Sequence, residues 1–407
     1  MSKSKYHINK AAIEYLTVSL LITTVLLCGY PYVFYRFIPL PHILFIAMFI
    51  LVLLAILLFF KRDISLLPKS LSYVVVVQIL VWAIYVIIHG IDTMYYAMII
   101  YIILSYISLI CLNNCDKGID RFLHAYNNWV VIMAVCGAIC FFLILIFGMP
   151  PLFEFENQDG RQAYCFGLTC TNSYWGDIIR FAGFFDEPGA MANWGVFALL
   201  MNKIAWNNSK CEKALMFSLV FTFSLAYYIQ LFFYICCYKL KNIKTIITAI
   251  VVVAVVAIGI YSTKGTEYDI YNLTFARLEI NTSTGLMAGD NRSELSELAK
   301  EQFYKAPIFG IGETKMAENE YMADNPYEVL ARSGLVGTIV TYLPLILMFA
   351  VGVSRKDKDI ICASCIIAVG YLQRPFHLNF MHPFILYSIV LLSLYKPIKG
   401  RMLLVKK

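Results

Sequence analysis

An arginine at the start of a predicted helix is the first feature that points to chemistry. In the polar segment 263–332, DNRSELSELAKEQFYKAP carries helix signals, since Asn291 with Glu294 resembles a capping box and Pro307 marks the stop. Apolar residues at three- and four-residue spacing give this helix a face that we expect to rest on the membrane interface or on the spans below it. Arg292 falls in the first turn, where a cation is unfavourable unless an anion binds beside it. Arg292 is therefore a candidate for binding a phosphate, with a solvated loop arginine as the alternative.

A second group of charged residues lies where the polar segment 149–188 gives way to an apolar run. The sequence RFAGFFDEPG places Arg180 and Glu187 beside a Pro-Gly pair that suits a first helical turn. One interpretation is an interfacial anchor, with aromatic rings at the membrane surface and charges facing water. The other interpretation is that Arg180 belongs to a functional site.

The elements that position these residues are predicted to be transmembrane helices. Of 407 residues, 60% are hydrophobic and only 14% are charged, which excludes an ordinary soluble domain. The first apolar run is long and lacks a clear cleavage site, so we expect a span there and not a removed signal peptide. The net charge of +7 comes from basic residues scattered over short loops, and no nucleic-acid partner is expected. We expect an all-α polytopic membrane protein with about 10 to 12 transmembrane helices.

The positions of the apolar runs and of the basic residues predict the topology. Runs long enough to cross a bilayer lie near 12–35, 38–60, 70–90, 95–112, 124–148, 189–206, 245–262, 334–353, 360–376 and 383–396. Basic residues gather in connections on one side, which the positive-inside rule assigns to the cytoplasm together with both termini. Segments 149–188 and 263–332 are then a first and a second outer loop.

Segment 214–238 has the length of one crossing, but a single crossing conflicts with the charge pattern. It would place the lysines that begin at Lys239, and the basic tail after them, on the outer side. A membrane hairpin over 214–238, broken near Thr222 and Ser224, keeps these residues inside. We therefore expect two short helices in this segment.

The cysteines and histidines do not predict a metal site. Most of the 12 cysteines lie singly inside spans, and the Cys362–Cys365 CxxC has no second pair. His377 and His382 lack nearby carboxylates, so structural packing is their expected role. We expect neither a metal ion nor another cofactor.

Cys165 and Cys170 differ from the other cysteines. They flank FGLT in a hairpin-like stretch of the first outer loop. An oxidising compartment would permit a disulfide between them, and the sequence leaves open whether it forms.

The order of the motifs resembles that of a known family. R-F-x-G-x-F-x-E-P-G is followed by R-x-E-L, A-P-I-F-G-I-G and D-N-P-Y-E-V-L-A-R-S-G-L-V-G. This order is similar to that of the bacterial O-antigen polymerase and O-antigen ligase superfamily, over roughly 175–350 in motif and the whole chain in architecture. The resemblance implies a glycosyltransferase of the bacterial inner membrane that uses undecaprenyl-diphosphate-linked oligosaccharides at the outer face. Its implied partners are that lipid-linked donor, membrane lipid, a flippase and a chain-length regulator.

The resemblance also assigns roles to individual residues. Arg180 matches the arginine before the E-P motif, Arg292 matches the arginine that opens the long-loop helix, and Arg277 is a third candidate upstream. The ligase branch has a His-Asn pair after the G-x-G stretch, with the His as proposed general base. This chain reads Asp324-Asn325 there, which favours a polymerase and makes Asn325 a candidate substrate contact.

The implied chemistry explains why these residue types are needed. A departing diphosphate develops negative charge, which the guanidinium groups of Arg180, Arg292 and Arg277 would meet with bidentate contacts in place of a metal. The attacking sugar hydroxyl must lose a proton, so a carboxylate would serve as base. Asp324 is the positional candidate; Glu187 is the other, unless it only holds Arg180 in place.

Two alternatives stand beside a repeat-unit polymerase. One is a ligase-like transferase that moves glycan from undecaprenyl diphosphate to another acceptor. The other is a transporter of lipid-linked sugar. Span interiors almost free of charge and the absence of a repeated half in the sequence count against the transporter.

Overall fold

The structure, a computed structural model, is mostly helical. It describes residues 10–27, 64–90, 93–156, 160–174, 178–185, 187–240, 247, 258, 261–265, 271, 293–318, 325–372 and 380–396. Within these residues, four helices are long and apolar enough to cross a membrane, namely α4 (Lys69–His89), α5 (Thr93–Asn113), α6 (Gly118–Phe147) and α14 (Glu328–Arg355). Large apolar side chains such as Leu80, Ile84 and Ile87 are exposed on the outward face of α4, as expected for contact with lipid. The chain is therefore a membrane protein with several candidate spans.

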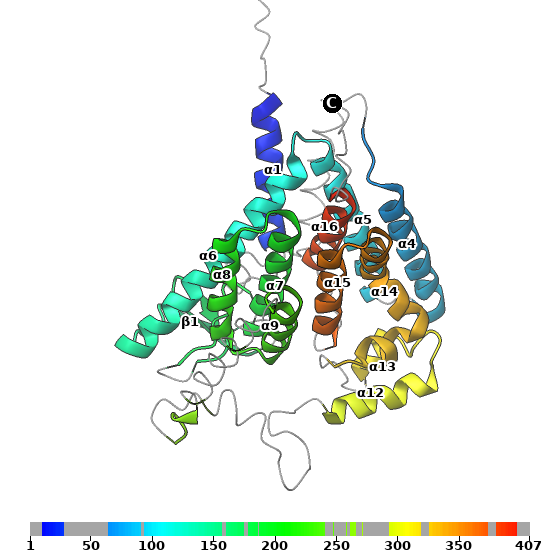
Figure 1. The fold of residues 1–407 in the computed structure, drawn as a ribbon. Helices are drawn as coiled ribbons and strands as arrows, with labels where there is room; N and C mark the ends of the chain where they lie inside the picture. The colour runs from blue at the N-terminus through cyan, green and yellow to red at the C-terminus, as the bar shows by residue number, and fades with distance from the viewer. Residues whose placement is uncertain are drawn as a thin grey trace, which may run out of the picture.

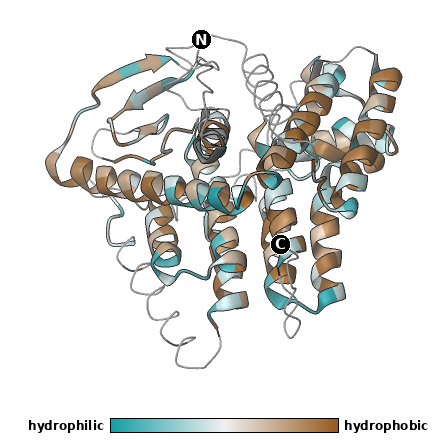
Figure 2. Cartoon of the chain, turned by 90° about the horizontal axis from the view of Figure 1, so that it is seen from above, coloured by the Kyte–Doolittle hydropathy of each residue, from teal (hydrophilic) through white to brown (hydrophobic). Residues whose placement is uncertain are grey.

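Shorter helices complete the bundle in Figure 1. They are α1 (Lys10–Leu27), α7 (Pro188–Ala205), α8 (Ser209–Ser218), α9 (Leu225–Tyr238), α12 (Ser293–Lys305), α13 (Glu313–Glu318), α15 (Lys358–Tyr371) and α16 (Met381–Tyr395). The predicted spans between 70 and 206 and between 334 and 396 coincide with helices to within several residues, because hydropathy alone determines them. The predicted spans at 38–60 and 245–262 fall outside the described residues, apart from isolated positions. Figure 2 shows hydrophobic residues along most of the helices and hydrophilic residues at many of their ends and turns.

One end of the bundle carries a set of lysines and is called the basic end here. Its lysines cap or flank helix ends and are Lys117, Lys203, Lys239, Lys356 and Lys396. In Figure 1 this end lies at the top, and α12 and α13 lie at the bottom. The opposite end, where α4 ends and α7 and α14 begin, is called the loop end.

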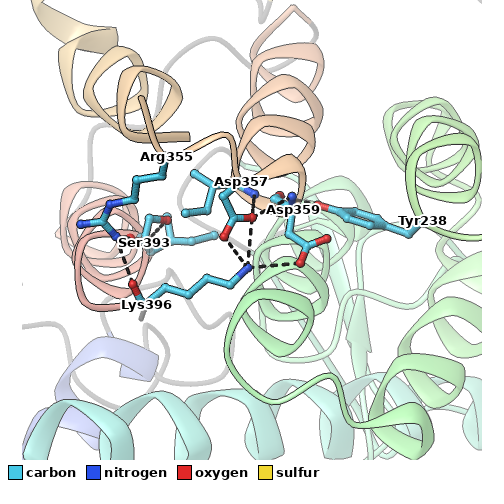
Figure 3. Close-up of polar contacts among 8 residues, drawn as sticks. Tyr238, Arg355, Asp357, Asp359, Ser393 and Lys396 are labelled. Atoms are coloured by element: carbon cyan, nitrogen blue, oxygen red, sulfur yellow. Dashed lines mark hydrogen bonds and ion pairs between the residues drawn. The ribbon is translucent and has the colours of Figure 1, made fainter. Parts of the chain in front are cut away.

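An ion-pair cluster holds helix termini together at the basic end (Figure 3). The Lys396 ammonium lies 2.9 Å from Asp357 Oδ2 and 3.2 Å from Asp359 Oδ2. The guanidinium of Arg355 donates to the backbone carbonyls of Ser393, Leu394 and Lys396, and so satisfies the free carbonyls at the end of α16. Tyr238 Oη donates to the Asp359 carbonyl at 2.7 Å. The ends of α9, α14 and α16 and the start of α15 are therefore fixed beside one another.

The chain reverses between α8 and α9. The short 3-10 helix η1 (Leu219–Thr222) is followed by Phe223 in the left-handed region, with φ 48°, and α9 starts at Leu225. Lys239, just after α9, lies 2.5 Å from the Glu212 carboxylate in the first turn of α8. The start of α8 and the end of α9 thus lie side by side at the basic end. That segment 214–238 is a membrane hairpin stays a prediction.

A small sheet is the part of the fold that an all-α prediction does not include. Strands β1 (Phe153–Glu156), β2 (Gln162–Cys165) and β3 (Cys170–Thr171) form an antiparallel three-stranded sheet in the order β1-β2-β3. One face of the sheet is buried, with Phe155, Ala163 and the two cysteines packed on Ala182. The prediction is wrong at this point because strands of two to four residues are too short for a reliable signal: β1 alternates as Phe-Glu-Phe-Glu, but over only four residues.

Candidate functional site

The predicted site residues divide into those that the structure describes and those that it does not. Arg277, Arg292 and Asp324 lie outside the described residues. Arg180 and Glu187 are described and lie at the loop end, beside the start of α7. Asn325 also lies at the loop end, just before α14. The two groups come from opposite halves of the chain.

Arg180 connects the loop before α7 to the turn between α8 and α9. Its Nε donates to the Thr222 carbonyl at 3.1 Å, at the end of η1. Its backbone is held as well, because its N–H donates to Ser173 and its carbonyl accepts from the Thr171 hydroxyl at 2.5 Å. Guanidinium groups bind phosphates and carboxylates in a fork geometry.

Glu187 occupies the N-cap position of α7. Its backbone is extended, with φ −154°, and its carbonyl accepts from Ala190 N at 3.1 Å and Met191 N at 3.3 Å. Its side chain makes no capping hydrogen bond to the described first turn of α7. The carboxylate is thus placed at the positive end of a helix, and a salt bridge with Arg180 stays a prediction.

The APIFGIG loop and the start of α14 form one interlocked unit. Gly334 has φ 62° and ψ −168°, so it interrupts helical geometry inside α14. Backbone hydrogen bonds join the loop to α14 just before this kink. Ile311 N donates to the Ala331 carbonyl at 2.9 Å, and Gly312 N donates to the Arg332 carbonyl at 3.0 Å. In return, the N–H groups of the two residues after Gly334 donate to loop carbonyls at 2.9 and 3.1 Å. Two motifs that the sequence shows separately are thus one structural element.

Glycine is needed at position 310 because the backbone of the APIFGIG loop lies directly against the backbone of α14 there. A Cβ at Gly310 would lie 2.3 Å from the Arg332 carbonyl oxygen, and φ is 71°. At Gly265 φ is 72°, but a Cβ would meet nothing within 4 Å. We expect Gly265→Ala to cost only the strain of a positive φ, about 1 kcal/mol. Gly310→Ala should cost about 1–3 kcal/mol more, because the overlap forces the loop away from α14.

Thermal unfolding of the two purified alanine variants in detergent checks this prediction. The melting temperature of Gly310→Ala should lie below that of Gly265→Ala, which serves as the matched control for φ. Equal melting temperatures would show that the loop is not held against α14 in this way.

Arg332 is buried and forms ion pairs with two carboxylates. Its side chain is 5% exposed, its Nη2 lies 2.6 Å from Glu328 Oε1, and its Nε pairs with Glu313 Oε2. Glu328 is one turn away on α14, whereas Glu313 begins α13 beyond the G-x-G loop. The arginine therefore holds α13 to α14 by charge. Arg332 stands in the ARSG motif, but nothing near it in the sequence identifies Glu313 as its partner, so its role is not predicted.

Asn325 has a visible structural role. It is 1% exposed, its Oδ1 accepts from Tyr327 N at 3.0 Å, and its carbonyl accepts from Glu328 N at 3.1 Å. This Asx-type turn starts α14 and holds Glu328 in position. Substrate contact by Asn325 stays a prediction.

Aromatic side chains of α4 and α5 lie beside the APIFGIG loop and the start of α14. The Tyr85 hydroxyl donates to the Ser333 carbonyl, next to the Gly334 kink. His89, the last residue of α4, lies with Nε2 3.1 Å from the Phe309 carbonyl. Tyr95 of α5 stacks against the imidazole, with ring centroids 5.6 Å apart. The loop is thereby held between α4 and α14.

Cys165 and Cys170 are cross-strand partners in the β2–β3 register. The backbone N–H and carbonyl of Cys170 bond to Gly183 and Ala182 on its other side. The two cysteines therefore form a non-hydrogen-bonded pair, in which side chains lie closest. The hydrogen bond from the Cys170 thiol lowers the pKa of Cys165 to about 6. This arrangement suits the disulfide that the sequence leaves open, and its formation stays a prediction.

Among the described residues, no group of three or more His, Cys, Asp and Glu side chains could hold a metal ion. No family model matches the sequence, and no curated protein matches it.

Proposed function

We propose that this protein is a polymerase that joins undecaprenyl-diphosphate-linked oligosaccharide repeat units into O-antigen or capsular polysaccharide at the outer face of the bacterial inner membrane. The observation that carries the proposal is the common location of distant motifs. RFAGFFDEPG, APIFGIG and NPYEVLARSG are far apart in sequence, yet all lie at the loop end. A site built at one end of several spans suits a substrate whose lipid tail stays in the bilayer.

The distribution of charge supports the orientation. The basic end carries lysines at the ends of α7, α9, α14 and α16 and at the start of α6. The positive-inside rule assigns such an end to the cytoplasm, so the loop end faces outward. A lipid-linked repeat unit, once flipped to the outer leaflet, would meet Arg180 with its diphosphate at the level of the interface.

Arginine side chains would stabilise the negative charge that develops on the diphosphate during the reaction. Arg180 is held through Nε by the turn between α8 and α9, so its guanidinium has a defined position before substrate arrives. Pre-organised guanidinium groups stabilise the charge that develops on a departing diphosphate without reorganisation. Arg292 and Arg277 would add to this clamp from the second outer loop. No metal or nucleotide sugar enters this proposal.

Deletion of the gene, followed by gel analysis of surface polysaccharide, tests the proposal. A polymerase predicts loss of long chains and survival of single repeat units attached to their acceptor. Polymer that is present but unattached would indicate a ligase. Loss of all surface glycan, with lipid-linked units retained on the inner leaflet, would indicate a transporter. Unchanged chain lengths would contradict all three functions.

A further inference from the structure

Strand β3 holds the backbone of the RFAGFFDEPG motif in place. The Cys170 N–H donates to the Gly183 carbonyl at 2.6 Å, and the Cys170 carbonyl accepts from Ala182 N at 2.9 Å. The Thr171 hydroxyl donates to the Arg180 carbonyl at 2.5 Å. The position of the Arg180 backbone therefore depends on the position of β3.

The pairing of β3 with β2 is short. Strand β3 has two residues, and its register with β2 spans two residue pairs, one of which is Cys165 with Cys170. Strand pairings of this length are marginally stable in water without further support. A covalent bond between the two strands would therefore strengthen the part of the sheet that carries Arg180.

The two cysteines are placed for such a bond. Cys165 and Cys170 are directly opposite each other in an antiparallel register, so their side chains lie on the same face of the sheet. They form a non-hydrogen-bonded pair, in which the Cα atoms are about 4.5 Å apart, and disulfides span Cα distances of roughly 4.4–6.8 Å. Both side chains are buried and pack with Ala182.

A third cysteine could compete for the same bond. The pKa of the Cys170 thiol is raised by its hydrogen bond to Cys165, by burial and by repulsion from Cys165 and Cys140, which places Cys140 of α6 near the pair. A bond to Cys140 would join the sheet to α6 and not strand to strand. The register favours the bond within the sheet, because Cys165 and Cys170 are direct cross-strand partners.

We propose that Cys165 and Cys170 form a disulfide that fixes β3 to β2 and so holds Arg180 in position; the effect of this bond on turnover rests on the proposed function. An outward-facing loop end lies in an oxidising compartment, where disulfides form and persist. The oxidant is a thiol oxidoreductase of that compartment in its disulfide form.

The electrons and protons of this oxidation balance in two exchange steps. The Cys165 thiolate attacks one sulfur of the oxidant's disulfide, which forms a mixed disulfide and releases the oxidant's other sulfur as a thiolate. The Cys170 thiolate then attacks the Cys165 sulfur, the Cys165–Cys170 bond forms, and the oxidant's first sulfur leaves as a thiolate. The oxidant thus gains two electrons, and the two protons lost by the cysteines convert it to a dithiol.

Mass spectrometry of a single tryptic peptide tests whether the disulfide forms. Cleavage after Arg161 and Arg180 releases residues 162–180, which contain both cysteines. Wild-type protein is denatured with an alkylating reagent and no reductant, and is then digested. We expect this peptide to be two hydrogens lighter than its dithiol form and to carry no alkyl group. Two alkyl groups on the peptide, or its linkage to the peptide that contains Cys140, would contradict the inference.

Trypsin cleavage of the folded protein in detergent tests whether the disulfide holds Arg180. Reductant should speed cleavage after Arg180 on the order of tenfold in the wild type, because loss of the bond allows β3 to open locally. A double variant with Cys165→Ala and Cys170→Ala should be cleaved at a rate that reductant does not change. Cys140→Ala is the matched control and should respond to reductant as the wild type does. If reductant leaves wild-type cleavage unchanged, the disulfide does not hold Arg180.

Turnover of lipid-linked repeat units separates this inference from the proposed function. Reductant should lower wild-type turnover at least about threefold, because a displaced Arg180 meets the diphosphate poorly, and should leave the double variant unchanged. If the wild type polymerises while reductant changes neither cleavage nor turnover, the inference fails and polymerase activity stands. If the wild type forms no polymer, the proposed function fails, whereas the peptide mass and the cleavage rate still decide whether the disulfide forms and holds Arg180.

Discussion

Replacing Arg180 by alanine is expected to abolish polymer while the protein still accumulates in the membrane. The side chain connects the loop before α7 to the turn between α8 and α9 through the hydrogen bond from Nε to the Thr222 carbonyl. In the proposed reaction its terminal nitrogens meet the diphosphate, and removing a fixed cation from a developing charge costs at least about a hundredfold in rate. Arg180→Lys should rescue poorly, because an ammonium cannot make the forked contact.

Arg180→Gln separates catalysis from structure. The glutamine amide nitrogen stands as many bonds from the backbone as the arginine Nε, so it can still donate to the Thr222 carbonyl. It lacks the charge and the terminal nitrogens. We expect Arg180→Gln to be folded and as inactive as Arg180→Ala, whereas Arg161→Ala, an exposed arginine of the same loop, should be active. Wild-type chain lengths from Arg180→Gln would show that Arg180 serves only the fold.

Arg332→Ala is expected to cause the largest loss of stability. The substitution leaves the carboxylates of Glu328 and Glu313 without the guanidinium that pairs with both. Removal of one partner from a buried pair costs about 3–5 kcal/mol, because the remaining charge stays buried. Unfolding of purified variants in detergent measures the loss.

Two further variants test the physical cause of that loss. Arg121→Ala breaks an exposed pair with Asp116, whose side chains are 42% and 68% exposed, and should cost less than about 1 kcal/mol. Adding Glu313→Gln and Glu328→Gln to Arg332→Met should restore most of the stability, since no unpaired charge is then buried. If Arg332→Ala and Arg121→Ala have the same free energy of unfolding, the buried ion pairs of Arg332 do not stabilise the fold.

The sequence predicts the helical part of this fold well for a physical reason. A span needs a long apolar run, so α4 to α7 and α14 to α16 follow from hydropathy within a few residues. A hairpin over 214–238 is predicted from charge, because a single crossing would place the later lysines on the outer side. Hydropathy is a local property of the sequence, and the charge pattern is obtained by counting basic residues along the chain. Neither requires knowledge of side-chain contacts.

Long-range contacts are what the sequence does not reveal. Arg332 pairs with Glu313 only because Gly310 and Gly334 allow two backbones to meet. His89 ends an apolar span, and its place beside the G-x-G loop depends on a contact between α4 and residues more than two hundred positions later. The sheet is not predicted because its strands have two to four residues, and an alternation as short as the Phe-Glu-Phe-Glu of β1 is a weak signal. Partner choice across such distances follows from packing and not from periodicity.

Purified protein supplied with lipid-linked repeat units tests the central claim most directly. In the presence of a metal chelator and without nucleotide sugar, we predict products of two or more repeat units and equal release of undecaprenyl diphosphate for each bond formed. The protein should fold and act in detergent or in vesicles, with Arg180→Ala as the inactive control. A folded wild-type preparation that binds the donor but leaves every repeat unit single would contradict the account.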